Sequence, residues 1–218
     1  MIFKRKIFGL RPPLAIFIIS MLILSLSGYL IIHLTLMKNL SEDGKFITVK
    51  TETFRFNFPR NWYAYPLYEN ETLCLIYLVN AESDSVAIIL YYKSWKQIFS
   101  LIKGNNLTDN LSIAISEVNR FFIILRERSQ NATLHFIENG TILISGYNAS
   151  YTIFNIQRAF TTNEGTYNIT GVFISLLMAN NGLFKIVFYT WKDEFWEDRY
   201  KTFKLEMLDS LVIKYGVK

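Results

Sequence analysis

Residues 14–36, LAIFIISMLILSLSGYLIIHLTL, form an apolar segment of 23 residues without a single charge. As a helix rising about 1.5 Å per residue it would extend roughly 34 Å, enough to cross the hydrocarbon core of a bilayer. Residues 1–13, which precede it, carry four basic side chains and no acidic one. Because positive charge stays on the cytoplasmic side, we expect a short basic cytoplasmic tail over residues 1–13 and the rest of the chain outside the cell.

A cleaved signal peptide is the alternative interpretation of this segment. Ser25 and Ser27 offer a pair of small residues for cleavage, but the apolar run continues about nine residues beyond them, further than a signal peptide requires. We therefore predict an uncleaved signal-anchor helix that contacts the lipid bilayer through residues 14–36. The protein would then be a single-pass protein of the cell membrane.

The charge and cysteine content exclude several classes of protein. The net charge is +5, and four of the positive charges lie before the apolar segment, so the remainder is almost neutral and offers no nucleic-acid-binding surface. Cys74 is the only cysteine, which excludes an intrachain disulfide, a cysteine zinc site and a CxxC redox pair. Because it lies in the apolar run LCLIYLV, we expect Cys74 to pack as a small apolar residue.

Asn-X-Ser/Thr motifs (sequons), the acceptor sites of N-linked glycans, occur at eight of the 17 asparagines, more than chance predicts. All eight follow the apolar segment, on the side expected to be outside. They predict a glycosylated outer-surface domain, although Asn and Ser/Thr also gather in turns and a sequon can remain unused. Heavy sequon use with one cysteine is more typical of an archaeal surface protein than of a bacterial or animal one. The sites are Asn39, Asn70, Asn106, Asn110, Asn131, Asn139, Asn148 and Asn168.

After a short linker, residues 37–48, the pattern indicates one extracytoplasmic α+β domain over residues 49–218. Asn-Gly pairs at residues 139–140 and 181–182 predict the turns of two β-hairpins, the first of type I′ with its sequon at the tip. Apolar runs and period-two alternation predict strands at residues 54–58, 73–79, 85–92, 133–137, 141–147, 151–160, 167–178 and 183–191.

Three helices are expected to cover this antiparallel sheet, whose apolar strands favour burial on both faces. The first is a short helix over residues 95–102. The second is capped by Thr108, and the third has a capping box at Thr190 and Asp193 and ends near Ile213. The core stripe expected on the second helix consists of Leu111, Ile115, Val118, Phe121, Phe122 and Leu125.

Short motifs at both ends of the domain resemble the PsbP-like family. FRFNFPRNW, residues 54–62, resembles the opening signature of that family, a strand ending in Phe-Pro with a Trp three residues on. KIVFY, residues 185–189, and MLDSL, residues 207–211, are similar to its closing pattern, and Gly146 stands where a long central strand often begins. The resemblance implies an α/β/α sandwich in a family of extracytoplasmic accessory and assembly proteins that are generally not enzymes. It carries no ligand or site residue onto this chain.

Residues able to support catalysis or metal binding are sparse. A hydrolase could use only His135, since the other histidine lies in the apolar segment, and His135 sits in an alternating run that favours an ordinary strand residue. Glu82 with Asp84 could hold a hard cation weakly, whereas the acidic residues at 193–198 suit the first turn of a helix. We therefore predict no enzyme activity, cofactor or metal.

Trp62, Tyr63, Tyr65 and Tyr68 form the one aromatic concentration outside the periodic segments. If exposed, these rings would offer a partner or glycan-binding surface; if buried, which we favour, they would close one end of the sheet. The sequence as a whole predicts an anchored interaction domain, an accessory or assembly subunit that binds another membrane or surface protein. A surface-filament or surface-layer subunit with a pilin-like N-terminal helix is the alternative.

Overall fold

The computed structural model describes residues 40–65, 68–94, 109–179 and 182–214. Apart from Leu40, these residues belong to one unit, Ser41–Lys218. The predicted tail, the predicted anchor over residues 14–36 and the predicted helix over residues 95–102 lie outside the described residues. Within the described ranges, no helix is both long enough and apolar enough to span a membrane.

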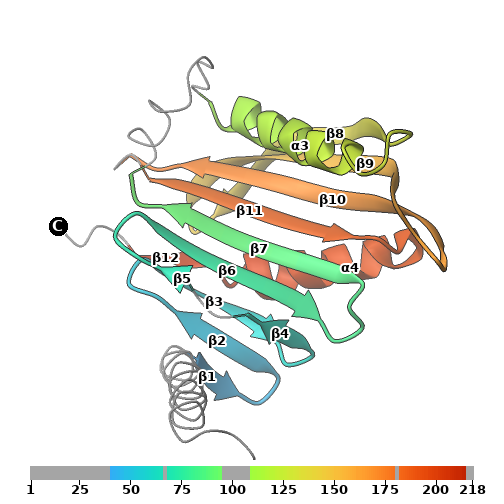
Figure 1. The fold of residues 1–218 in the computed structure, drawn as a ribbon. Helices are drawn as coiled ribbons and strands as arrows, with labels where there is room; N and C mark the ends of the chain where they lie inside the picture. The colour runs from blue at the N-terminus through green and yellow to red at the C-terminus, as the bar shows by residue number, and fades with distance from the viewer. Residues whose placement is uncertain (1–39, 66–67, 95–108, 180–181, 215–218) are drawn as a thin grey trace, which may run out of the picture. The chain divides into compact units, whose positions relative to one another are not determined.

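Two β-sheets form the framework of the domain (Figure 1). The larger sheet has the order β4-β6-β7-β11-β10-β9-β8, with β5 also paired to β6, and the smaller has the order β1-β2-β3-β12. Every strand pair with a defined register is antiparallel, as predicted. The strands are β1 (Leu40–Asp43), β2 (Phe46–Lys50), β3 (Phe54–Pro59), β4 (Trp62–Ala64), β5 (Tyr68–Glu69), β6 (Leu73–Asn80), β7 (Ser85–Tyr92), β8 (Thr133–Ile144), β9 (Tyr147–Thr162), β10 (Gly165–Leu177), β11 (Leu183–Thr190) and β12 (Val212–Ile213).

The smaller sheet begins earlier than the sequence indicated. From residue 40 onward, the segment predicted as a linker, residues 37–48, contributes β1 and the start of β2. A turn at Gly44, whose φ of 53° suits glycine, joins the two strands. The polar residues before Phe46 are therefore strand and turn rather than a free connection.

α3 (Asn110–Arg126) covers one face of the larger sheet, packing on β9 and β10. Its N-cap is Asp109 rather than the predicted Thr108, and the Asp109 carboxylate accepts a hydrogen bond from Ser112 N at 2.8 Å. Val118 is fully buried as predicted. The partly buried members of the predicted stripe that pack on the same cluster are Phe121, Phe122 and Leu125.

The opposite face of the larger sheet packs on the smaller sheet and on the C-terminal helical segment. Alternation along β11 separates the two faces: Tyr189 contacts Phe121 of α3, while Phe188 stacks on Phe203 at 4.7 Å between ring centroids. Phe54 of the smaller sheet meets Phe184 edge to face at 5.4 Å. Helices therefore cover both faces, and Figure 1 shows α3 on the near side of the sheet and α4 on its far side.

The C-terminal segment is not the single helix that was predicted. It consists of η1 (Asp193–Phe195), α4 (Trp196–Thr202) and a π-helical turn, η2 (Phe203–Leu208), and it ends before β12. The expected capping box is also wrong. Thr190 Oγ1 donates to the carbonyl oxygen of Asp84 at 2.8 Å, and the Asp193 carboxylate accepts from Thr170. Tertiary partners thus replace the local contacts that the spacing suggested.

The hairpin expected at Asn139-Gly140 lies elsewhere. β8 runs straight through both residues with a bulge near Ile137, and the turn to β9 is Ser145-Gly146, where φ is 52° and 84°. Two consecutive residues with positive φ are typical of a type I′ turn. The glycine at 140 serves another purpose, because a Cβ there would lie 2.7 Å from the hydroxyl of Tyr151. Asn139 is therefore an exposed strand residue and not a hairpin tip.

Candidate functional site

The aromatic residues singled out from the sequence lie at the β4–β5 edge of the larger sheet (Figure 1). In the ladders with β6, Trp62 lies opposite Asn80, Tyr63 opposite Val79, and Tyr68 opposite Leu75. Residues opposite each other in an antiparallel pair point to the same face, and the face alternates along each strand. Tyr63 and Tyr68 therefore share the face on which α3 packs further along the sheet, and Trp62 points to the opposite face.

Trp62 belongs to the hydrophobic core. Its side chain is 2% exposed, and its ring lies 6.3 Å from that of Phe188. For this residue the buried alternative therefore holds, because the register with β6 directs it toward α4 and η2.

The three tyrosines are in contrast exposed. Tyr63 is 63%, Tyr65 55% and Tyr68 54% exposed. Tyr65 meets Tyr77 edge to face at 5.3 Å, so it lies over β6 on the same side as Tyr63 and Tyr68. The half-buried residues Leu75, Tyr77 and Val79 of β6 continue this surface. We call these six residues the tyrosine face.

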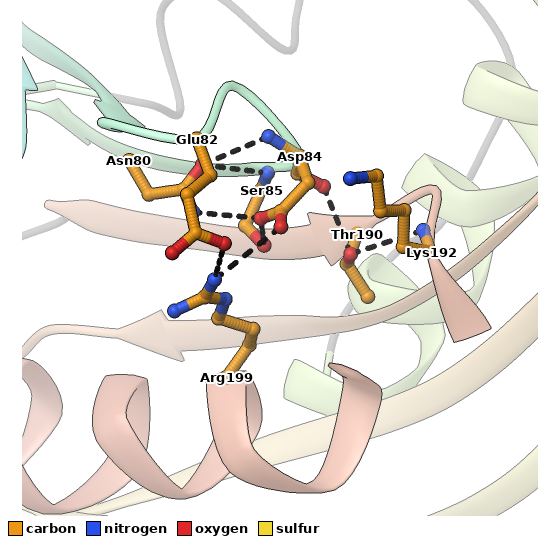
Figure 2. Close-up of polar contacts among 7 residues, drawn as sticks. All are labelled: Asn80, Glu82, Asp84, Ser85, Thr190, Lys192 and Arg199. Carbon is orange, nitrogen blue, oxygen red and sulfur yellow. Dashed lines mark hydrogen bonds and ion pairs between the residues drawn. The ribbon is translucent and has the colours of Figure 1, made fainter. Parts of the chain in front are cut away.

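A buried polar network fixes the end of β6 next to the tyrosine face (Figure 2). Asn80 closes the β6–β7 turn by accepting from Asp84 N and Ser85 N at 2.9 and 3.0 Å. One carboxylate oxygen of Asp84 accepts from Asn80 Nδ2 and Ser85 Oγ, each at 2.7 Å. The whole Asp84 residue is buried, so these bonds hold a charge out of water.

Arg199 of α4 supplies the opposite charge. Its guanidinium lies 3.4 Å from the second carboxylate oxygen of Asp84 and also pairs with Glu82. Burial would raise the pKa of the Asp84 carboxyl, but the bond from Ser85, the charge of Arg199 and the bond from Asn80 together lower it below its usual range. Arg199 thus pairs with both members of the acidic pair considered as a cation site and joins the β6–β7 turn to α4.

A second buried ion pair was not predicted from the sequence. Lys185 of β11, 8% exposed in its side chain, lies 2.6 Å from the Glu117 carboxylate of α3, and its ammonium stands 5.1 Å from the Tyr92 ring centroid. The sequence feature that could have indicated this pair is the single lysine inside the apolar strand LFKIVFYT. A charge on a buried strand requires a partner, and here the partner fixes α3 on the sheet.

The other polar candidates do not assemble into a catalytic or metal site. His135 lies exposed on β8 opposite Asn155, and within the described residues it has no hydrogen bond to a carboxylate or hydroxyl. Asp193 bonds to Thr170 and Asn168. In the part of the chain that the structure describes, no three His, Cys, Asp or Glu side chains are placed to hold a metal. Cys74 is buried, which raises the pKa of its thiol to about 12.

No family model and no curated protein sequence matches the chain. Among solved structures, it is similar to the solution structure of cyanobacterial PsbP (CyanoP) from Synechocystis sp. PCC 6803, with a TM-score of 0.52. The match has 9% sequence identity and covers 79% of this chain and 95% of that one. The fold is PsbP-like. The fold expected from the opening and closing motifs is therefore confirmed, and at this identity the likeness shows the fold alone.

Six of the eight sequons of the chain fall within the described residues; Asn39 and Asn106 lie outside them. Asn110 and Asn168 use both atoms of their amides in hydrogen bonds. Asn110 donates to Asn148 O and accepts from Leu177 N, and Asn168 donates to Asp193 and accepts from Arg158 N. The exposed sequon asparagines are Asn70, Asn131, Asn139 and Asn148.

Proposed function

We propose that the PsbP-like domain is a non-catalytic interaction domain, an accessory or assembly subunit of a membrane or cell-surface complex. The observation that carries this proposal is the exposure of three tyrosines on one face of a sheet edge. Tyrosine rings bury a large area on binding at a low entropic cost, and their hydroxyls satisfy polar groups at the rim. The near-neutral charge of the domain favours a protein partner over nucleic acid.

The proposal includes a location. Residues 14–36 would anchor the chain in the cell membrane, with residues 1–13 in the cytoplasm and the N-glycosylated domain outside. The apolar segment, the basic residues before it and the eight sequons after it support this placement. The partner would be another membrane or surface protein, reached from close to the lipid.

Site-specific photo-crosslinking tests the interaction surface. A photoreactive residue is placed at position 63 of the full-length protein in its own membranes, and, as a matched control, at the exposed Ile123 of α3 (58% exposed). We expect one discrete protein adduct from position 63 and none of the same mass from position 123. Identical adducts at both positions, or none at position 63, would contradict the proposal.

A further inference from the structure

The sequon Asn70-Glu71-Thr72 forms the exposed turn between β5 and β6. Asn70 N donates to Leu73 O at 2.9 Å, and the Asn70 side-chain oxygen accepts from Thr72 N and Leu73 N, each at 2.8 Å. Thr72 Oγ1 lies 2.9 Å from the same oxygen. The hydroxyl that defines a sequon therefore already contacts the amide that would be modified, on an exposed turn of the kind that tolerates a bulky group.

Tyr68 stands beside the nitrogen that would carry the sugar. Asn70 Nδ2 donates to the Tyr68 hydroxyl at 3.0 Å, and Tyr68 is 54% exposed. A sugar linked to Nδ2 begins next to this phenol ring, whose flat apolar face can pack against the C–H face of a pyranose. Of the eight sequons, only this one has an aromatic residue two positions before its asparagine.

Asn168 provides the internal contrast. Its amide donates to Asp193 Oδ2 at 3.0 Å and accepts from Arg158 N at 3.0 Å, and its side chain is only half-exposed. A glycan at Asn168 would compete with contacts that hold β9, β10 and η1 together. At Asn70, by contrast, only the bond to Tyr68 is exchanged for a contact with the same side chain.

We propose that Asn70 carries an N-linked glycan whose first sugar packs on Tyr68. In the transfer step, Asn70 Nδ2 attacks the anomeric carbon of a polyprenyl-phosphate-linked oligosaccharide, forming the N–C bond. The anomeric C–O bond to the phosphate breaks with its electron pair, and one amide proton is lost to a base. This rests on the outward placement proposed above. It assigns Tyr68 to a sugar and leaves Tyr63 and Tyr65 for the protein partner.

Glycopeptide mass spectrometry of the full-length protein from its own membranes tests the modification. We expect peptides containing Asn70 to carry glycan and to lose it in Thr72→Ala. Bare Asn70 together with a modified Asn131 would overturn the proposal and leave the outward placement standing. Bare asparagines at every sequon would overturn both.

Thermal unfolding tests the contact between sugar and ring. In the glycosylated protein, we expect Tyr68→Ser to lower Tm by about 2–4 °C, and Tyr68→Phe, which keeps the ring, to lower it less. In the Asn70→Gln background, which cannot be glycosylated, Tyr68→Ser should have almost no effect. An equal effect of Tyr68→Ser with and without the glycan would overturn the packing of the first sugar on Tyr68.

Discussion

At the scale of single residues, two ion pairs join side chains that are distant in the sequence. Arg199 meets Asp84 across 115 residues, and Lys185 meets Glu117 across 68. Both pairs are withdrawn from water, where an unpaired charge costs far more than a paired one contributes. Their effect on stability is therefore best seen when one partner is removed.

The Asp84 carboxyl has a pKa below its usual range in the folded protein, so it stabilises the fold above the unfolded pKa, near 3.9, and this contribution is lost as pH falls through the folded pKa. We expect Asp84→Asn to lower the free energy of unfolding by about 3 kcal/mol at pH 7. Urea denaturation from pH 7 to pH 2 should show the difference from wild type shrinking with acid.

Glu82→Gln is the matched control for this series, because its side chain is 59% exposed and should contribute at most about 1 kcal/mol. A difference between Asp84→Asn and wild type that stays constant down to pH 2 would show that shape, rather than charge, causes the loss.

Lys185→Met removes the cation from the second pair and leaves Glu117 with the more exposed Arg120, 3.5 Å away. We expect this variant to lose about 3 kcal/mol of unfolding free energy in chemical denaturation. The double variant Lys185→Met with Glu117→Met should regain most of it, since neither charge remains buried. Arg120→Met is the control and should have little effect; a double variant as unstable as the single one would refute the pairing argument.

At the scale of elements, sequence patterns succeeded where local physics determines the structure. The stripe of Phe121, Phe122 and Leu125 located α3, and nearly continuous apolar runs located β6 and β7. The patterns failed where a residue distant in the sequence determines the local structure. The Asn-Gly pair predicted a turn at Gly140, but the absence of a side chain there makes room for Tyr151. The spacing predicted Thr190 as a helix cap, but its hydroxyl donates to the carbonyl oxygen of Asp84. Trp62 is buried and its three tyrosine neighbours are exposed because of the register with β6, which no local sequence pattern contains.

Substitution at Gly140 tests the position of the β8–β9 hairpin. We expect Gly140→Ala to cost about 1–3 kcal/mol of unfolding free energy, because its Cβ would meet the Tyr151 ring. In a Tyr151→Ser background this cost should disappear. Gly146→Ala, where φ is +84° and no atom lies within 4 Å, should be destabilising in both backgrounds. If the cost of Gly140→Ala were the same in both backgrounds, the close approach of Tyr151 would not be its cause.

The β4–β5 edge can be tested by removing two rings of the tyrosine face. Tyr63→Ser with Tyr65→Ser should reduce the yield of a cross-linked or co-purified partner at least about tenfold, since aromatic anchors dominate interface energies. The free energy of unfolding should change by about 1 kcal/mol or less, because both side chains are exposed. Ile123→Ser with Ile124→Ser on α3 is the matched control, and an equal loss of partner from that pair would contradict the assignment.

At the scale of the whole molecule, the proposal depends on the side of the membrane that the domain occupies. The proposed surface partner and the proposed glycans both require the domain to lie outside the cell. The basic residues within 1–13 and the eight downstream sequons agree on that orientation.

Protease protection in sealed vesicles tests this orientation. In right-side-out vesicles we expect added protease to remove the domain while a tag fused before residue 1 stays intact, and inside-out vesicles should give the reverse pattern. Detergent provides the control by making both ends accessible. A domain protected in right-side-out vesicles and cleaved in inside-out ones would reverse the proposed topology.

β12 pairs Ile213 with Phe54, and Ser210 Oγ accepts a hydrogen bond from Asn57 N, 153 residues earlier in the chain. β3 therefore cannot pair with its neighbour β12 until almost the whole domain has been synthesised. Contacts of such long sequence separation form late in folding. The smaller sheet is thus completed only by the last strand of the domain, whereas β8, β9, β10 and β11 pair with their neighbours in the chain and have no such dependence on β12.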